Sequence, residues 1–67
     1  MDNIDMKDYI TQELAALDRS IVATPHTRED LESFANANQG SSDILLMQMA
    51  MQYVYKLALE NLKMELS

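Results

Sequence analysis

Apolar residues recur along the first part of the chain at intervals of three and four, a spacing that places side chains on one side of a helix. Acidic residues stand near the start of this pattern and Arg19 near its end, as the helix dipole favours. The pattern predicts a helix over about residues 3–21 with a single apolar side. That side is formed by Met6, Ile10, Leu14, Leu17 and Ile21.

A proline and a threonine mark the start of the next predicted helix. Pro25 cannot continue a helix, and it disfavours helical geometry at the residue before it. The side chain of Thr27 can accept the unpaired backbone N–H groups of a helix start, and the acids that follow suit its positive end. We therefore expect a short helix over about residues 28–38. Its predicted buried residues are Leu31, Phe34 and Ala35.

The third predicted helix, over about residues 43–65, is apolar on more than one side. Gly40 can end the preceding helix in a left-handed cap, and Ser41 or Ser42 can cap this one. An ordinary surface helix has an apolar stripe about 100° wide. Here the apolar residues cover well over half of the circumference and leave one polar band. The band contains Gln48, Gln52, Lys56, Glu60 and Lys63.

Two apolar seams can be traced along this helix. One contains Ile44, Met47, Met51, Val54 or Tyr55, Ala58 and Leu62. The other contains Leu46, Ala50, Tyr53, Leu57 and Met64. The two preceding helices offer too little apolar surface to cover both seams, so we expect a second copy of the helix to cover one of them. We place the expected dimer interface on the second seam, although the sequence leaves open which seam pairs.

Composition supports an all-α fold for the whole chain. Gly and Pro occur once each in 67 residues, which favours helices over strands and turns. We expect one small domain over residues 1–67, with two longer helices flanking a short one. A core of this size is marginal without crosslinks, metal or oligomerisation. The chain has no cysteine and one histidine, so we expect a homodimeric helical bundle formed through the C-terminal helix.

The net charge of −6 restricts the expected partners and location. Direct binding to nucleic acid or to an anionic membrane requires a basic patch, and this chain carries 11 acidic against 5 basic residues. Its longest uncharged apolar stretch, residues 44–55, is shorter than the roughly 20 residues of a membrane span. The acidic start does not resemble a secretory signal. We expect a cytoplasmic protein.

No catalytic, cofactor-binding or metal-binding constellation stands out in the sequence. His26 has no serine or cysteine nucleophile with a partner set beside it. A di-metal bundle would use a Glu-x-x-His motif, whereas the order here is His26-Thr27-Arg28-Glu29, reversed and at a helix entrance. We therefore expect no enzymatic activity, no cofactor and no metal.

These observations favour a non-catalytic interaction protein that acts as a homo-oligomer: a small regulator, adaptor or assembly factor, with another protein as a possible partner. One alternative is an acidic inhibitor or nucleic-acid mimic, in which the acids of residues 1–32 occupy a basic site on a partner protein. A second alternative is a small ligand- or metal-binding bundle.

Overall fold

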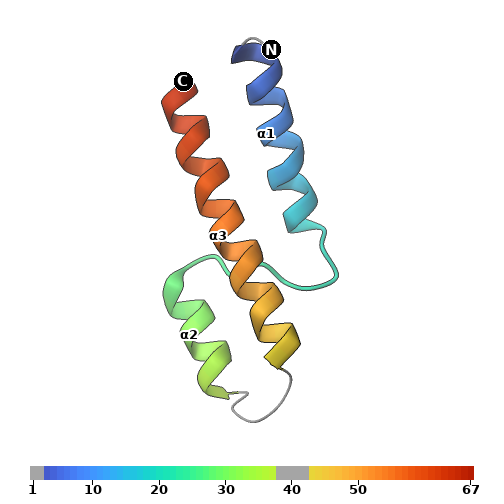
Figure 1. The fold of residues 1–67 in the computed structure, drawn as a ribbon, viewed down its shortest axis with the longest axis vertical. Helices are drawn as coiled ribbons and strands as arrows, with labels where there is room; N and C mark the ends of the chain where they lie inside the picture. The colour runs from blue at the N-terminus through green and yellow to red at the C-terminus, as the bar shows by residue number, and fades with distance from the viewer. Residues whose placement is uncertain (1–2, 38–42) are drawn as a thin grey trace.

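The fold, taken from a computed structural model that describes residues 3–37 and 43–67, is all-helical as expected. Within these residues there are three helices and no strands (Figure 1). Helix α1 covers Asn3–Asp18, α2 covers Arg28–Ala37, and α3 covers Asp43–Leu66. The two longer helices flank the short one in sequence, as the apolar spacing predicted.

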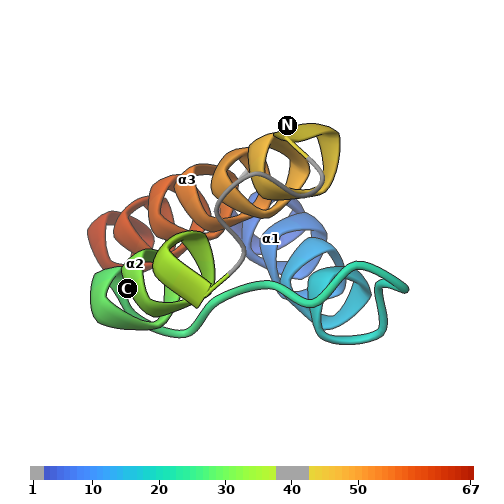
Figure 2. The same cartoon turned by 90° about the horizontal axis from the view of Figure 1, so that it is seen from below.

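Helix α3 is the helix that both of the other described helices contact. Helix α1 lies beside its C-terminal half and α2 beside its N-terminal half, and the α1–α2 connection crosses α3 between them (Figure 1). Seen along the long axis, α3 forms one layer, while α1, the connection and α2 form the other (Figure 2). In the described part of the chain, α1 and α2 each contact α3 and do not contact each other. The outer side of α3 therefore has no neighbouring helix.

Helix α1 ends three residues earlier than the apolar spacing predicted. The Thr24 hydroxyl donates to the carbonyl oxygen of Leu17 at 3.3 Å, so it occupies one of the carbonyls that a longer helix would have used. Ile21, expected to be the last residue of the apolar side, lies in the connection and is fully exposed. The prediction for Ile21 was wrong because the chain turns there to cross α3.

The predicted cap of α2 is confirmed. The Thr27 hydroxyl oxygen accepts the backbone N–H of Asp30 at 3.1 Å, and the Thr27 carbonyl accepts the N–H of Leu31 at 3.2 Å. The guanidinium of Arg28 also pairs with the carboxylate of Glu32 at 2.9 Å, one helical turn away. Local sequence therefore fixes where α2 begins.

The predicted apolar residues of α2 are only half-buried, which corrects the expectation that they are buried. They are Leu31, Phe34 and Ala35. Among the described helices, α2 packs on α3 alone, so solvent reaches much of its surface. The caps predicted at Gly40, Ser41 and Ser42 lie outside the described residues.

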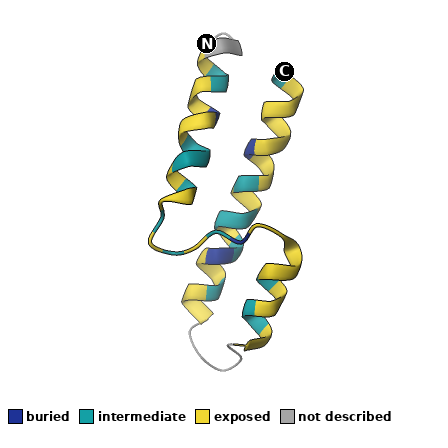
Figure 3. Cartoon of the chain, turned by 180° about the vertical axis from the view of Figure 1, so that it is seen from behind, coloured by how far each residue is buried: buried dark blue, intermediate teal, exposed yellow. Residues whose placement is uncertain are grey.

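The core is small and lies on one side of α3. The buried apolar side chains of the described residues are Ile10 of α1 together with Met49 and Leu59 of α3, and Pro25 of the connection is buried as well. Ile10 has no exposed surface. Most of the remaining chain is exposed or half-buried (Figure 3). This core is the marginal one expected of 67 residues.

Candidate functional site

An apolar strip runs along the side of α3 that carries no neighbouring helix. Met51 is 70% exposed and Val54 is 64% exposed, although both lie in the middle of the longest helix. We call this surface the outer strip, and its members are Ile44, Met47, Met51, Val54 and Ala58. They belong to the first of the two seams traced in the sequence.

The side of α3 opposite the outer strip is the side that packs within the chain. Met49 and Leu59 are only 8% and 5% exposed. At 100° per residue these two positions lie well away from the outer strip. Helix α3 thus has a buried apolar side and an exposed one, which explains why its apolar residues cover more than half of its circumference.

The second seam, on which we expected the dimer interface, is partly half-buried and partly exposed. Three of its members, Leu46, Ala50 and Tyr53, are half-buried because they turn toward the rest of the chain. The other two, Leu57 and Met64, are exposed at the edge of the helix. The continuous exposed apolar surface of α3 is therefore the outer strip.

The polar band of α3 holds the connection against the helix. The Gln52 side-chain amide donates to the Val22 carbonyl at 2.9 Å and to the Thr24 hydroxyl at 2.8 Å. One turn later, the Lys56 ammonium lies 3.4 Å from the carbonyl of His26 and donates to it. These contacts keep the connection on the inner side of α3, which leaves the outer strip uncovered.

We call the hydrogen bonds of Gln52 and Lys56 to the connection the polar clamp. The sequence analysis did not predict it. Gln48, Gln52 and Lys56 recur every four residues in a helix that is otherwise apolar, and the Gln48 amide donates to the Gln52 side-chain oxygen at 3.2 Å. Such a row of donors inside an apolar helix could have indicated a partner with unpaired carbonyls, because buried backbone oxygens need hydrogen bonds. The connection supplies those carbonyls.

A second polar contact joins α3 to α1 near the outer strip. The Tyr55 hydroxyl donates to the Glu13 carboxylate at 2.7 Å, and the Tyr9 hydroxyl donates to the same oxygen at 3.5 Å. The hydrogen bond to the Glu13 carboxylate is the main cause that raises the pKa of Tyr55 above its ordinary value, because it stabilises the protonated phenol. The ring of Tyr55 is thereby fixed beside Met51.

The ionisation of Tyr55 tests this contact. Subtracting the ultraviolet titration of a Tyr55→Phe variant from that of the unchanged chain isolates the Tyr55 phenol, whose midpoint we expect above the ordinary pKa of 10.0. The contact should persist below pH 10.0 and be lost as the pH rises through the raised pKa, since the fold favours the protonated form. A midpoint at or below 10.0 would show that Glu13 does not hold Tyr55.

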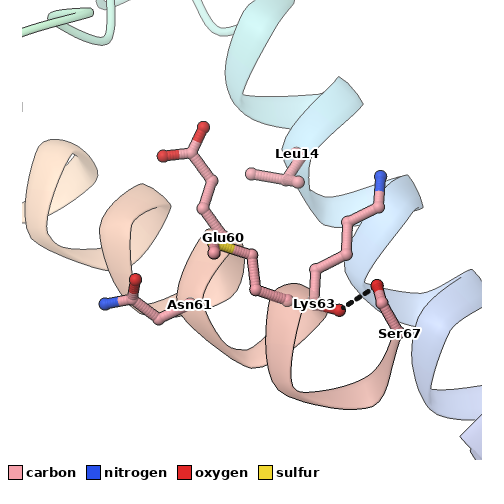
Figure 4. A pocket seen from close by; sticks show the side chains of 6 residues that line it. Leu14, Glu60, Asn61, Lys63 and Ser67 are labelled. Carbon is pink, nitrogen blue, oxygen red and sulfur yellow. Dashed lines mark hydrogen bonds between the residues drawn. The ribbon is translucent and has the colours of Figure 1, made fainter.

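Shallow hollows accompany the exposed side of α3. One, of about 490 Å³, lies on the outer strip between Met51, Val54, Tyr55 and Ala58. Another, of about 510 Å³, lies between α1 and the C-terminal end of α3, where the charged ends of Glu60 and Lys63 extend on either side of Leu14 (Figure 4). The first is apolar and the second is amphipathic. Both are open to solvent, so they suit a protruding side chain better than an enclosed small molecule.

The described residues contain neither a metal-ligand cluster nor a candidate membrane span. No group of three or more histidine, aspartate or glutamate side chains lies close enough to hold a metal ion in residues 3–37 and 43–67. No helix in the same ranges is long and apolar enough to cross a membrane. His26 is exposed, and it contributes its backbone carbonyl rather than its ring to the clamp.

No protein-family model, curated protein or solved structure matches this chain.

Proposed function

We propose that this chain is a non-catalytic interaction protein that acts as a homo-oligomer through the outer strip of α3. The observation that carries the proposal is the exposure of large apolar side chains along the strip, including Ile44 at 80% and Met51 at 70%. Soluble monomers rarely expose contiguous apolar surface of more than a few hundred Å². Surfaces of this kind mark sites where another apolar surface binds.

The size of the core supports association as well. The few buried side chains leave a 67-residue chain with little apolar burial of its own. Small domains without disulfides or metals commonly gain the missing stability from oligomerisation. Covering the outer strip would add apolar burial at about 25 cal/mol per Å². Binding of a second chain would thereby raise the free energy of unfolding as well as form the functional oligomer.

The arrangement of the acids gives less support to the inhibitor or mimic alternative. Helix α1, which carries Asp8, lies beside the C-terminal half of α3, whereas α2, which carries Glu29 and Asp30, lies beside its N-terminal half (Figure 1). The acids are therefore divided between two helices that each contact α3 and do not contact each other. Binding through them would weaken steeply with added salt, whereas binding through the outer strip should depend little on salt.

Thermal unfolding at several chain concentrations tests the proposal. Folding coupled to association makes the melting temperature depend on concentration, because only the folded chain binds its partner. We expect the melting temperature to rise as the concentration increases, both at low and at high salt. A melting temperature that stays constant over a wide concentration range would contradict a homo-oligomeric protein.

A further inference from the structure

The outer strip has the spacing of a coiled-coil seam. Its five residues are separated by three, four, three and four positions, an average of 3.5. A straight helix has 3.6 residues per turn, so a seam that repeats every 3.5 residues is matched to a second helix that lies alongside it. The spacing therefore favours a long helix as the group that covers the strip.

The strip is uncharged along its whole length, which restricts the chemistry of that helix. The residues of the strip are all apolar, and Gln52 and Lys56 lie on the inner side of α3, where they donate hydrogen bonds to the α1–α2 connection. An amphipathic helix that binds an anionic lipid surface carries a basic polar face, whereas this chain has a net charge of −6. The partner that fits is an uncharged apolar helix in water.

The chain exposes more surface than a compact monomer of its size. The radius of gyration is 13.8 Å, compared with about 11 Å for a compact domain of this length. The accessible surface is 5099 Å², compared with about 4,300 Å² for a compact monomer of this mass. An elongated chain with this much surface has room for an interface of standard size, in which each partner buries about 800 Å².

These observations point to one occupant, and this inference rests on the proposed function. We propose that a second copy of the chain covers the outer strip, with the two α3 helices antiparallel. In the register that aligns the two strips, Met47 faces the partner's Ala58, Met51 faces the partner's Val54, and Ile44 faces the partner's Asn61. The layers of Met47 and Met51 then set a long methionine against a smaller side chain, between helix axes about 8–10 Å apart.

The position of Glu65 favours an antiparallel pair of helices. The 3.5-residue spacing of the outer strip, continued toward the C-terminus, falls on Asn61 and Glu65, beside Leu62 of the seam traced in the sequence. In a parallel pair, Glu65 would lie opposite Glu65 of the partner subunit, and like charges in one seam repel each other. In the antiparallel register Glu65 lies beyond the first residue of the partner's α3. The antiparallel pair also sets the helix dipoles in opposite directions, which is favourable.

Cysteine pairs test the register, because the chain has no cysteine of its own. Met47→Cys and Ala58→Cys are prepared as separate chains, mixed under reducing conditions to exchange subunits, and then oxidised. We expect a disulfide between the two different chains in the mixture and little crosslinking of either chain alone. In the antiparallel register, two copies of residue 47 lie about 16 Å apart along the helix axis. A disulfide requires Cα atoms roughly 4.4–6.8 Å apart.

The other outcomes overturn this inference in different ways. Crosslinking of each variant with itself, without the mixed species, means a parallel pair. No crosslinking by oxidation or by a short bis-maleimide, in a protein of twice the chain mass, means that dimers form through another surface and leaves the proposed function standing. A chain that is monomeric throughout contradicts both the register and the homo-oligomer, and leaves the strip to a different partner. Ser33→Cys, on the exposed side of α2, is the control that should not crosslink.

Discussion

Replacing Met51 by glutamate should dissociate the dimer that we propose. Met51 lies at the centre of the outer strip and is 70% exposed in the single chain, so the substitution costs the isolated fold little. In the dimer it would bury an unpaired carboxylate, which costs at least about 3 kcal/mol. A cost of that size weakens association by more than about a hundredfold. Light scattering of the variant and of the unchanged chain at the same concentration measures the effect.

Two further substitutions identify the surface that is responsible. Ser33→Glu adds the same charge on an exposed position of α2, away from the outer strip, and should leave the mass unchanged. Leu57→Glu adds it at the edge of α3, on the seam where the sequence placed the interface. If Leu57→Glu dissociates the dimer while Met51→Glu does not, the seam predicted from the sequence is the interface and the outer strip is not.

Replacing Ile10 by alanine should have the largest effect on folding. Ile10 is the one fully buried large side chain of the described residues, and such a truncation costs about 2–5 kcal/mol. The total stability of a chain this short is of the order of 3–10 kcal/mol. We therefore expect the variant to lose a large share of the free energy of unfolding. Circular dichroism during urea unfolding measures the loss.

The chain contains a matched control for this prediction. Ile21 is the same residue type and belongs to the same sequence pattern, but it is fully exposed in the connection. Ile21→Ala should change the free energy of unfolding by no more than about 0.5 kcal/mol. Equal losses in the two variants would mean that α1 continues through Ile21 and packs as the apolar spacing first suggested.

The helices could be predicted from the sequence because each has its own local signal. The spacing of apolar residues gave α1 and α3, and the threonine before α2 gave its start, where the Thr27 hydroxyl accepts the N–H of Asp30. The end of α1 could not be predicted in the same way. Ile21 continues the apolar spacing, but the hydrogen bonds of Val22 and Thr24 to Gln52, about thirty residues later, draw the chain out of the helix.

For a related reason, the sequence predicts that α3 has two apolar sides but not which of them is exposed. Both apolar seams of α3 are visible in the sequence, but which one is exposed depends on the side along which the connection crosses the helix. That side is set by long-range contacts of Gln52 and Lys56. Periodicity describes one helix at a time, so it identifies two apolar sides without saying which of them the rest of the chain covers.

Sedimentation equilibrium of the unchanged chain measures whether two copies associate, as they must if a second copy covers the outer strip. We expect a mass of twice 7.6 kDa at micromolar concentration, in low and in high salt. We also expect the mass to decrease toward 7.6 kDa on dilution. A single species of 7.6 kDa at every concentration would mean that the outer strip does not pair with a second copy.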